Sequence, residues 1–233
     1  MTEKLIKSAD RVKNHGEIFT PKRIVDLMID QPEINAKVND LQATFLEPSA
    51  GEGAFLTEIL ARRMSIALAT SSNFSEYNRN CLIGLASLYG IELLEDNVES
   101  LVMNMNDTFR NAYRDGAQSA FEHEPSSKVL NSAKVIIRAN MVQGDALKRI
   151  TSDGKPIILS EWASVAGKKD YVQRTEYTFD AIVDGSGPTG KVAGATQQLD
   201  LFALDDDSTT DQHDEIKYVP CRWVDIYKEQ LVE

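Results

Sequence analysis

Apolar positions near the start of the chain recur with the period of a helix. Ile24, Leu27 and Met28 follow Thr20 and Pro21 at the spacing i, i+3, i+4. Threonine is a good N-cap, and proline fits the first helical position, where its missing N–H costs nothing. The pattern therefore predicts an amphipathic helix that begins at Thr20 and Pro21 and ends near residue 30.

A short apolar run at residues 43–46 has the character of a strand. It breaks into the sequence Glu-Pro-Ser-Ala-Gly-Glu-Gly, residues 47–53. Apolar residues then return at helical spacing, which predicts a helix from residue 54 to about residue 69; they are Phe55, Ile59, Leu60 and Ile66. Residues 43–69 are thus expected to form a strand, a glycine turn and a helix.

The same alternation continues further along the chain. A helix is expected up to about residue 87, a strand at 88–93, and a helix from Glu95 to a loop around Gly116. The run at residues 135–137 is compatible with either helix or strand, and residues 140–143 form a third short strand. Strands that alternate with helices predict an α/β fold with a doubly wound, mostly parallel sheet.

The pattern changes after residue 150. Two β-rich runs at 155–162 and 170–183 suggest a hairpin, and a Gly-, Gln- and Asp-rich stretch follows. We therefore expect an N-terminal helical segment (1–42), a cofactor-binding core (43–150), a β-rich insertion (151–184), an acidic flexible loop (185–217) and a C-terminal segment (218–233).

Composition narrows the class of protein. Hydrophobic residues make up 42% and charged residues 26%, as in ordinary globular domains. The N-terminus lacks an apolar signal region, and no stretch approaches the roughly 18 apolar residues of a membrane span. Cys81 and Cys221 match no metal or redox spacing. We therefore expect a cytoplasmic protein with reduced thiols and no contact with a membrane.

The formal net charge of −11 argues against a self-sufficient DNA clamp, because phosphates are neutralised by lysine and arginine. The charge is uneven. Seven acidic residues lie between Leu199 and Lys217, whereas residues 1–23 carry six basic side chains against three acidic ones. A solvated surface explains both segments, and a weak phosphate contact by the N-terminal segment is the functional alternative.

Three acidic residues stand at the ends of the three successive predicted strands: Glu47, Glu92 and Asp145. The carboxyl ends of parallel strands form the ligand-binding crevice of an open sheet. Gly51 and Gly53 allow a sharp turn and a close approach of the backbone to a ligand. Carboxylates suit a ligand that offers an ammonium group, ribose hydroxyls and an adenine amino group, and they disfavour phosphate. S-adenosylmethionine has these groups and no phosphate.

The segment His-Gly-Glu-Ile-Phe-Thr-Pro, residues 15–21, resembles the N-terminal motif of the adenine-specific DNA methyltransferases of bacterial restriction–modification systems. That motif precedes an Asp/Glu-Pro-x-x-Gly-x-Gly motif at about this distance, and the resemblance covers roughly residues 11–148. It implies a Rossmann-like, S-adenosylmethionine-dependent domain. It also implies that the segment of Phe19, Thr20 and Pro21 folds over the cofactor.

The resemblance implies roles for further residues. Glu47 corresponds to the first-strand acid near the methionine moiety, with Pro48, Gly51, Gly53 and Phe55 beside it. Glu92 corresponds to the acid that holds the ribose hydroxyls, and Leu93 to a residue that packs on the adenine. Asp145 corresponds to the acid that accepts a hydrogen bond from the adenine amino group. No metal ligand is implied.

The family's catalytic Asn/Asp-Pro-Pro-Tyr/Phe motif is absent from this sequence. That motif accepts the hydrogens of the target amine while an aromatic ring stacks on the flipped adenine. The nearest segment, residues 179–184, continues as Gly-Ser-Gly-Pro, so Asp184 lacks both the proline pair and the aromatic. The sequence therefore identifies no catalytic residue.

Two explanations fit this absence. The catalytic motif lies beyond Glu233, in a longer enzyme or in the second product of a split gene, or the chain is a degenerate methyltransferase that keeps only the cofactor site. The late apolar segment at 218–231 favours the first. We expect a site-specific DNA adenine N6-methyltransferase whose isolated chain is inactive. Its partners are DNA, through the full-length protein or a partner subunit, and a restriction or specificity subunit.

The alternative from another class is an inactive binding module that serves a partner subunit. An RNA or protein methyltransferase is a third reading, because Rossmann-like sites serve many substrates. The motif at residues 15–21 favours DNA.

Overall fold

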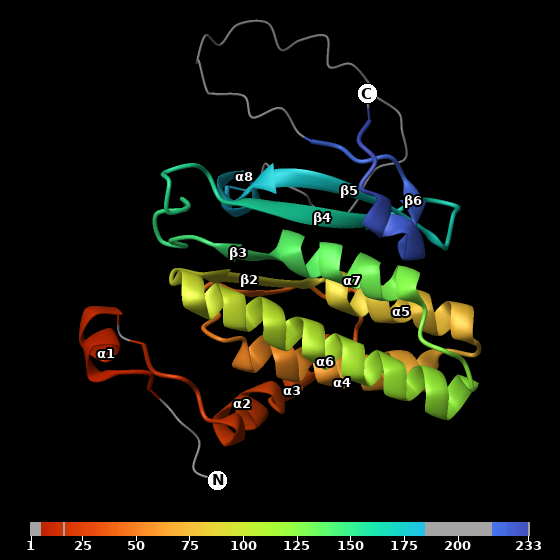
Figure 1. Ribbon diagram of the computed structural model, residues 1–233, viewed down its shortest axis with the longest axis horizontal. Coiled ribbons are helices and arrows are strands. Elements are labelled where there is room, and N and C mark those ends of the chain that lie inside the picture. Colours follow the sequence, from red (N-terminus) through yellow and green to blue (C-terminus); the bar gives the residue numbers. More distant parts are fainter. Residues whose placement is uncertain (1–5, 16, 185–215, 233) are drawn as a thin grey trace, which may run out of the picture.

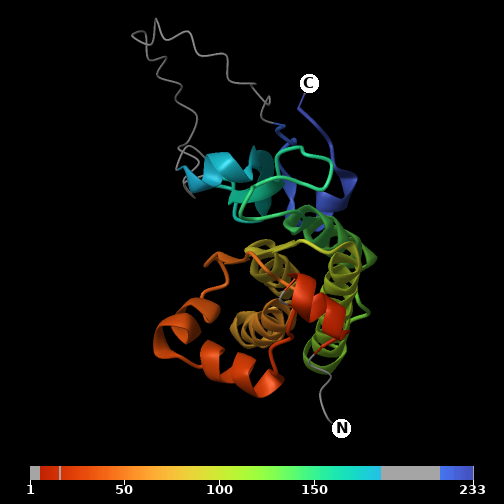
Figure 2. The same ribbon diagram turned by 90° about the vertical axis from the view of Figure 1, so that its left-hand side faces the viewer.

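The computed structural model describes residues 6–15, 17–184 and 216–232. Three short helices open the chain, α1 (Ala9–His15), α2 (Lys22–Ile29) and α3 (Pro32–Val38). In Figure 1 they lie at one end of the molecule, and in Figure 2 α1 crosses close to the start of α6 (Glu95–Phe121). None of the described helices is both long enough and apolar enough to cross a membrane.

A three-stranded parallel sheet forms the centre of an α/β fold. Its strands are β1 (Phe45–Glu47), β2 (Leu88–Glu92) and β3 (Met141–Gln143), in the order β1-β2-β3. The register places Glu47 beside Gly90 and Glu92 beside Gln143. The crossovers are α4 (Ala54–Thr70) with α5 (Phe74–Ala86), and α6 with α7 (Ser127–Asn140). The carboxyl ends of the strands consequently meet along one edge.

The alternation of side chains along β2 divides the core into two parts. Leu88 joins a large cluster built mainly from α4, α5, α6 and α7, whereas Ile91 joins a smaller cluster with Ile157, Leu159 and Phe179. The long helices therefore pack on one face of the parallel sheet, and the predicted double winding, with helices on both faces, is not seen among the described residues. The other face of β2 contacts a second layer formed by the later part of the chain (Figures 1 and 2).

That second layer is antiparallel. Strands β4 (Ile158–Ser164) and β5 (Tyr171–Thr178) form a hairpin, and β5 also pairs with the short β6 (Cys221–Arg222). Tyr89 of β2 donates a hydrogen bond of 2.7 Å to the Ser160 carbonyl of β4. Helix α8 (Phe179–Val183) and the 3₁₀ helix η1 (Trp223–Lys228) complete this part.

The entrance to β1 is held by a buried arginine. Arg63 of α4 is fully buried, and its guanidinium donates to the carbonyls of Lys37, Asp40 and Ala43, which precede the strand. Burial lowers the pKa of Arg63 to about 10. This contact holds the segment that leads into β1 against α4.

Several elements differ from the sequence-based expectation. Helix α6 runs through Gly116, where a loop was predicted. A Cβ at this position would lie 2.2 Å from the Tyr77 hydroxyl, so a glycine is needed for Tyr77 to pack against the helix. The packing of Tyr77 outweighs the cost of about 1 kcal/mol for glycine in a helix. Residues 135–137 belong to α7. The predicted acidic loop, 185–217, lies almost entirely outside the described residues.

Two predicted element boundaries are wrong. The strand expected to run through residues 179–183 ends at Thr178, whose hydroxyl accepts from the Ala181 amide and starts α8. Helix α2 begins one residue later than predicted, with Pro21 rather than Thr20 at the N-cap. Pro21 is extended (ψ 144°), and its carbonyl accepts from Ile24 and Val25. Thr20 is thereby released from capping.

Candidate functional site

The glycine turn after β1 adopts the conformation that its sequence requires. Gly51 and Gly53 have φ values of +53° and +90°, in the left-handed region where side chains are disfavoured. The Ala50 amide donates to the Ile91 carbonyl, which ties the turn to β2. The ring of Phe19 lies over Gly51, 3.7 Å from the place a Cβ would occupy. The N-terminal motif therefore folds onto the turn.

A pocket of about 420 Å³ opens between the N-terminal segment and this turn. Five of the residues predicted to bind a cofactor line it: Phe19, Thr20, Glu47, Gly51 and Phe55. The remaining lining comes from Ile18, Ser49, Ala50, Glu52, Ala54, Thr57 and Asn104. Among the described residues, the carboxylates of Glu47 and Glu52 line the pocket and no basic side chain does, so it is suited to a cationic or neutral ligand.

Glu47 is the ionisable group most affected by this pocket. Burial raises its pKa, and a hydrogen bond with the Ser49 backbone offsets only part of that shift. No ion pair to Glu47 occurs among the described residues, so its carboxylate is desolvated without a matching cation. A positively charged ligand group in the pocket would supply that charge.

Glu92, at the end of β2, is buried and already largely hydrogen-bonded. Its Oε2 accepts from the Gly51 amide at 2.8 Å, and its Oε1 accepts from the Leu94 amide at 3.0 Å and from Asn97 Nδ2 at 3.3 Å. A carboxylate has about four acceptor positions. The remaining acceptor position is on Oε2, beside the glycine turn, and it can accept a hydrogen bond from a ligand hydroxyl.

A polar network that the sequence analysis did not identify surrounds Asn97. Asn97 contacts Lys7, Arg11, Glu17 and Glu92, and Arg11 in turn forms ion pairs with Glu17 and Asp96. A signal was present in the sequence: Asn97 occupies the helical stripe that continues with Leu101, Met105, Phe109 and Tyr113, all of them buried. An asparagine on such a stripe indicates a buried polar contact.

The remaining predicted residues do not line the pocket. Gly53 caps α4, Pro48 is exposed in the turn, and Pro21 caps α2. Leu93 is 49% exposed beyond the end of β2. Its side chain is therefore open to contact from solvent.

Asp145 also lies at the end of its strand, but its carboxylate is used locally. Oδ1 accepts from the amides of Leu147 and Lys148, and Oδ2 pairs with Lys148 Nζ at 3.1 Å. These contacts with Lys148, the backbone amide first, lower the pKa of Asp145. A ligand would have to share or displace them.

Three basic side chains of the described N-terminal segment are paired with acids. Lys7 pairs with Glu52 and Asp96, Arg11 pairs with Glu17 and Asp96, and Lys22 pairs with Asp26 and Glu58. Their charges are neutralised by the chain's own acids. Asp184, the nearest counterpart of a catalytic acid, pairs with Arg149 at 3.2 Å.

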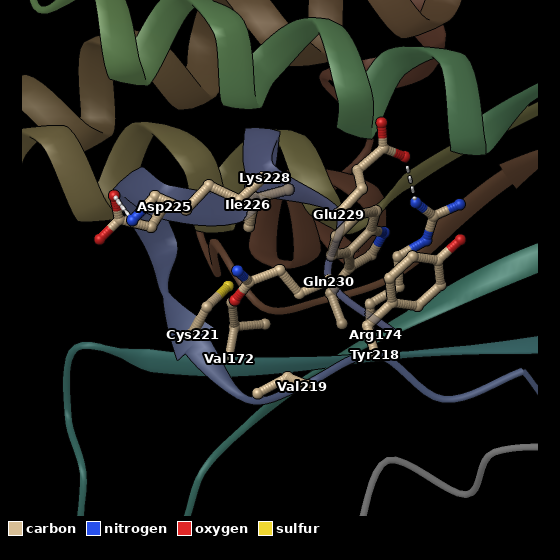
Figure 3. Close-up of a pocket in the computed structure, with 11 residues that line it drawn as sticks. Val172, Arg174, Tyr218, Val219, Cys221, Asp225, Ile226, Lys228, Glu229 and Gln230 are labelled. Atoms are coloured by element: carbon tan, nitrogen blue, oxygen red, sulfur yellow. Dashed lines mark hydrogen bonds and ion pairs between the residues drawn. The ribbon is translucent and has the colours of Figure 1, made fainter. Parts of the chain in front are cut away.

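A second pocket, far smaller at about 20 Å³, lies where the C-terminal segment meets β5 (Figure 3). There Arg174 is enclosed between the rings of Trp162 and Tyr218, with its guanidinium carbon 5.2 Å and 4.3 Å from their centroids. Glu229 and Glu176 pair with the same guanidinium. Every charge here has a partner, so this contact holds the chain together and leaves little space for a ligand.

Among the described residues, no group of histidine, cysteine or acidic side chains is arranged to hold a metal ion. Comparison of the chain with protein-family models, with curated proteins and with solved structures gives no significant match.

Proposed function

We propose that this chain is the S-adenosylmethionine-binding part of an adenine-specific DNA methyltransferase with a Rossmann-like fold. The observation that carries the proposal is the desolvated Glu47 carboxylate in a pocket closed by Phe19 over the glycine turn. The parallel order β1-β2-β3 with helical crossovers supports the fold assignment.

The polar groups of the pocket suit this ligand in particular. Glu47 in the pocket offers a negative charge to the sulfonium or ammonium group. Glu92 does not line the pocket, but its Oε2 contacts the amide of the lining residue Gly51 and offers an acceptor to a ribose hydroxyl. Phe19 supplies an apolar cover. A nucleotide with phosphates would bring its negative charge close to Glu47 and Glu52, which line the pocket.

Transfer of the methyl group to adenine requires groups that we do not assign to this chain. Asp184 is paired with Arg149 and is followed by no aromatic residue within the next four positions. We therefore propose that this chain binds the methyl donor in the cytoplasm and does not itself transfer the methyl group. The catalytic motif and DNA recognition would come from the full-length protein or from a partner subunit.

An inactive binding module that serves a partner subunit is the second candidate, favoured by the same ion pair of Asp184. The coding sequence after Glu233 separates the two. An Asn-Pro-Pro-Tyr-type motif within a few tens of codons, in frame or at the start of an adjacent reading frame, supports the enzyme. Loss of that motif from both places supports the module.

Isothermal titration of the folded chain with S-adenosylmethionine tests the proposal. We expect saturable binding, weaker binding of ATP, and a loss of about fivefold or more in affinity for Glu47→Gln, which corresponds to about 1 kcal/mol of charge interaction. The control Glu124→Gln removes the same charge from the exposed loop between α6 and α7 and should leave the affinity unchanged. Absence of binding by a folded sample, or tighter binding of ATP, would overturn the proposal.

A further inference from the structure

Asn97 occupies an unusual place for an uncharged polar residue. It lies in the first turn of α6, is only 1% exposed, and is surrounded by charged groups from four parts of the chain. Lys7 precedes α1, Arg11 lies within it, Glu17 belongs to the N-terminal motif and Glu92 ends β2. Burying a polar side chain is costly unless its hydrogen bonds are satisfied, and here all of them are.

The chemistry of the amide explains why asparagine stands there. Its Oδ1 accepts from Lys7 at 2.7 Å and from Arg11 at 3.3 Å, while its Nδ2 donates to Glu17 at 2.6 Å and to Glu92 at 3.3 Å. A carboxylate has no donor and an ammonium group has no acceptor. An uncharged amide serves both the two cations and the two acids.

These contacts connect the two sides of the pocket. Glu17 is two residues from Phe19, whose ring covers Gly51, and Glu92 accepts from the Gly51 amide. Lys7 continues the connection to Glu52 of the turn and lies 5.8 Å from the Phe19 ring centre. Phe19 and the glycine turn are thus held in place relative to each other through the side chain of Asn97.

We propose that Asn97 is a positioning residue for the ligand of this pocket: it holds Phe19 over the glycine turn and turns Oε2 of Glu92 toward the ligand hydroxyl. This role rests on the proposed function. Asn97 itself touches Glu92 and Glu17 rather than the ligand.

The charge balance makes a specific test possible. The groups that face Asn97 or its partners are Lys7 and Arg11 against Glu17, Glu52, Glu92 and Asp96. Asn97→Asp keeps the size and the acceptor but replaces the donor with a further negative charge beside Glu17 and Glu92. Protonation of the new carboxyl at lower pH restores a donor.

The experiment measures S-adenosylmethionine affinity by isothermal titration between pH 8 and pH 5.5. We expect Asn97→Asp to bind about tenfold more weakly than the wild type at pH 8, as for a buried hydrogen bond replaced by an unpaired group. The ratio of the two affinities should shrink as the pH falls. Asn111→Asp, which adds the same charge on the exposed side of α6, should bind like the wild type throughout.

Hydrogen exchange without ligand supplies a second measurement. Residues 6–21 should exchange faster in Asn97→Asp and in Glu17→Gln. Glu17 lies outside the helical core, and Glu17→Gln should also lower the affinity for S-adenosylmethionine. A wild type that binds no S-adenosylmethionine overturns the proposed function and this role with it. Wild-type binding combined with an unchanged affinity in Asn97→Asp, or with a loss that is the same at every pH, overturns the positioning role alone.

Discussion

Two arginine-centred contacts hold the two ends of the described chain. They differ in whether a nearby carboxylate is left without a cation. Arg11 ties the N-terminal segment to α6 through Glu17 and Asp96, and Arg174 ties the C-terminal segment to β5 through Glu229 and two aromatic rings. Both join segments that are distant in sequence. The residues that directly follow Glu17 line a pocket of about 420 Å³, whereas Arg174 itself lines a pocket of about 20 Å³.

The difference lies in the balance of charge around each arginine. At the C-terminal contact each carboxylate has a cation, and the rings of Trp162 and Tyr218 fill the remaining space. At the N-terminal contact, Lys7 and Arg11 pair with Glu17, Glu52 and Asp96, and the desolvated Glu47 has no ion pair with any described residue. A desolvated group without a partner is the feature that separates a candidate binding site from a structural contact.

The largest effect expected from this comparison is on stability. Arg174→Ala removes both ring contacts, takes the arginine from Glu176 and takes one of two arginines from Glu229, so we expect a loss of about 2–3 kcal/mol in the free energy of unfolding. Urea denaturation measures it. Arg138→Ala, which removes an exposed cation from the same Glu229, should cost less than about 1 kcal/mol. An S-adenosylmethionine affinity lowered by Arg174→Ala would contradict the separation of the two regions.

A smaller effect is expected at the glycine turn. Gly53→Ala forces an alanine into positive φ and places a Cβ 2.5 Å from Leu101 Cδ1, so we expect a loss of about 1–2 kcal/mol together with weaker ligand binding. Gly154→Ala has a similar φ of +79° but meets no atom within 4 Å. It should lose similar stability with unchanged binding. Equal binding by both variants would show that the turn does not shape the pocket.

The smallest effect concerns pH. Affinity for a cationic ligand should be full above the raised pKa of Glu47 and should fall about fivefold as the pH drops through it, because the protonated acid offers no charge. Arg11 holds the pKa values of Glu17 and Asp96 below their usual range, so these acids stay ionised in that window. Glu47→Gln should abolish the dependence. A dependence that persists in this variant would assign it to another group.

The stability of the unliganded chain should follow the opposite sign. The folded state holds a proton on Glu47 at a pH where the unfolded state, near the usual value of 4.5, has lost it. Protonation relieves the burial cost, so this group's contribution to stability rises as the pH falls toward 4.5. Thermal unfolding of the wild type and Glu47→Gln between pH 7 and pH 5 measures it.

Much of the site could be predicted because its chemistry is local. The glycine turn needs left-handed backbone at Gly51 and Gly53, and only the sequence of the turn itself decides that. Glu47 and Glu92 follow directly from the ends of their strands. The same reasoning placed Asp145 at the correct edge but could not show that the amides of Leu147 and Lys148 occupy its carboxylate.

The features that the sequence pattern did not predict depend on contacts between residues that are distant in the sequence. Gly116 looks like a helix break until Tyr77 packs against it, and Arg63 looks like a surface residue until the carbonyls before β1 surround it. Residues 179–183 have a strand-like composition, but the hydroxyl of Thr178 caps a helix there. Hydrophobic periodicity carries none of this information, because it describes one element at a time.

The sequence by itself determined the alternation of strands and helices, the glycine turn and the acids at the strand ends, since these depend on backbone preference and on the spacing of apolar residues. Only the tertiary structure decided which of those acids is available. It left one acceptor position free on Glu92, used Asp145 in its own turn, and left Glu47 in a pocket where no described residue supplies a cation. Desolvation and pairing depend on every neighbour in space, and so the availability of a charge is a property of the folded chain.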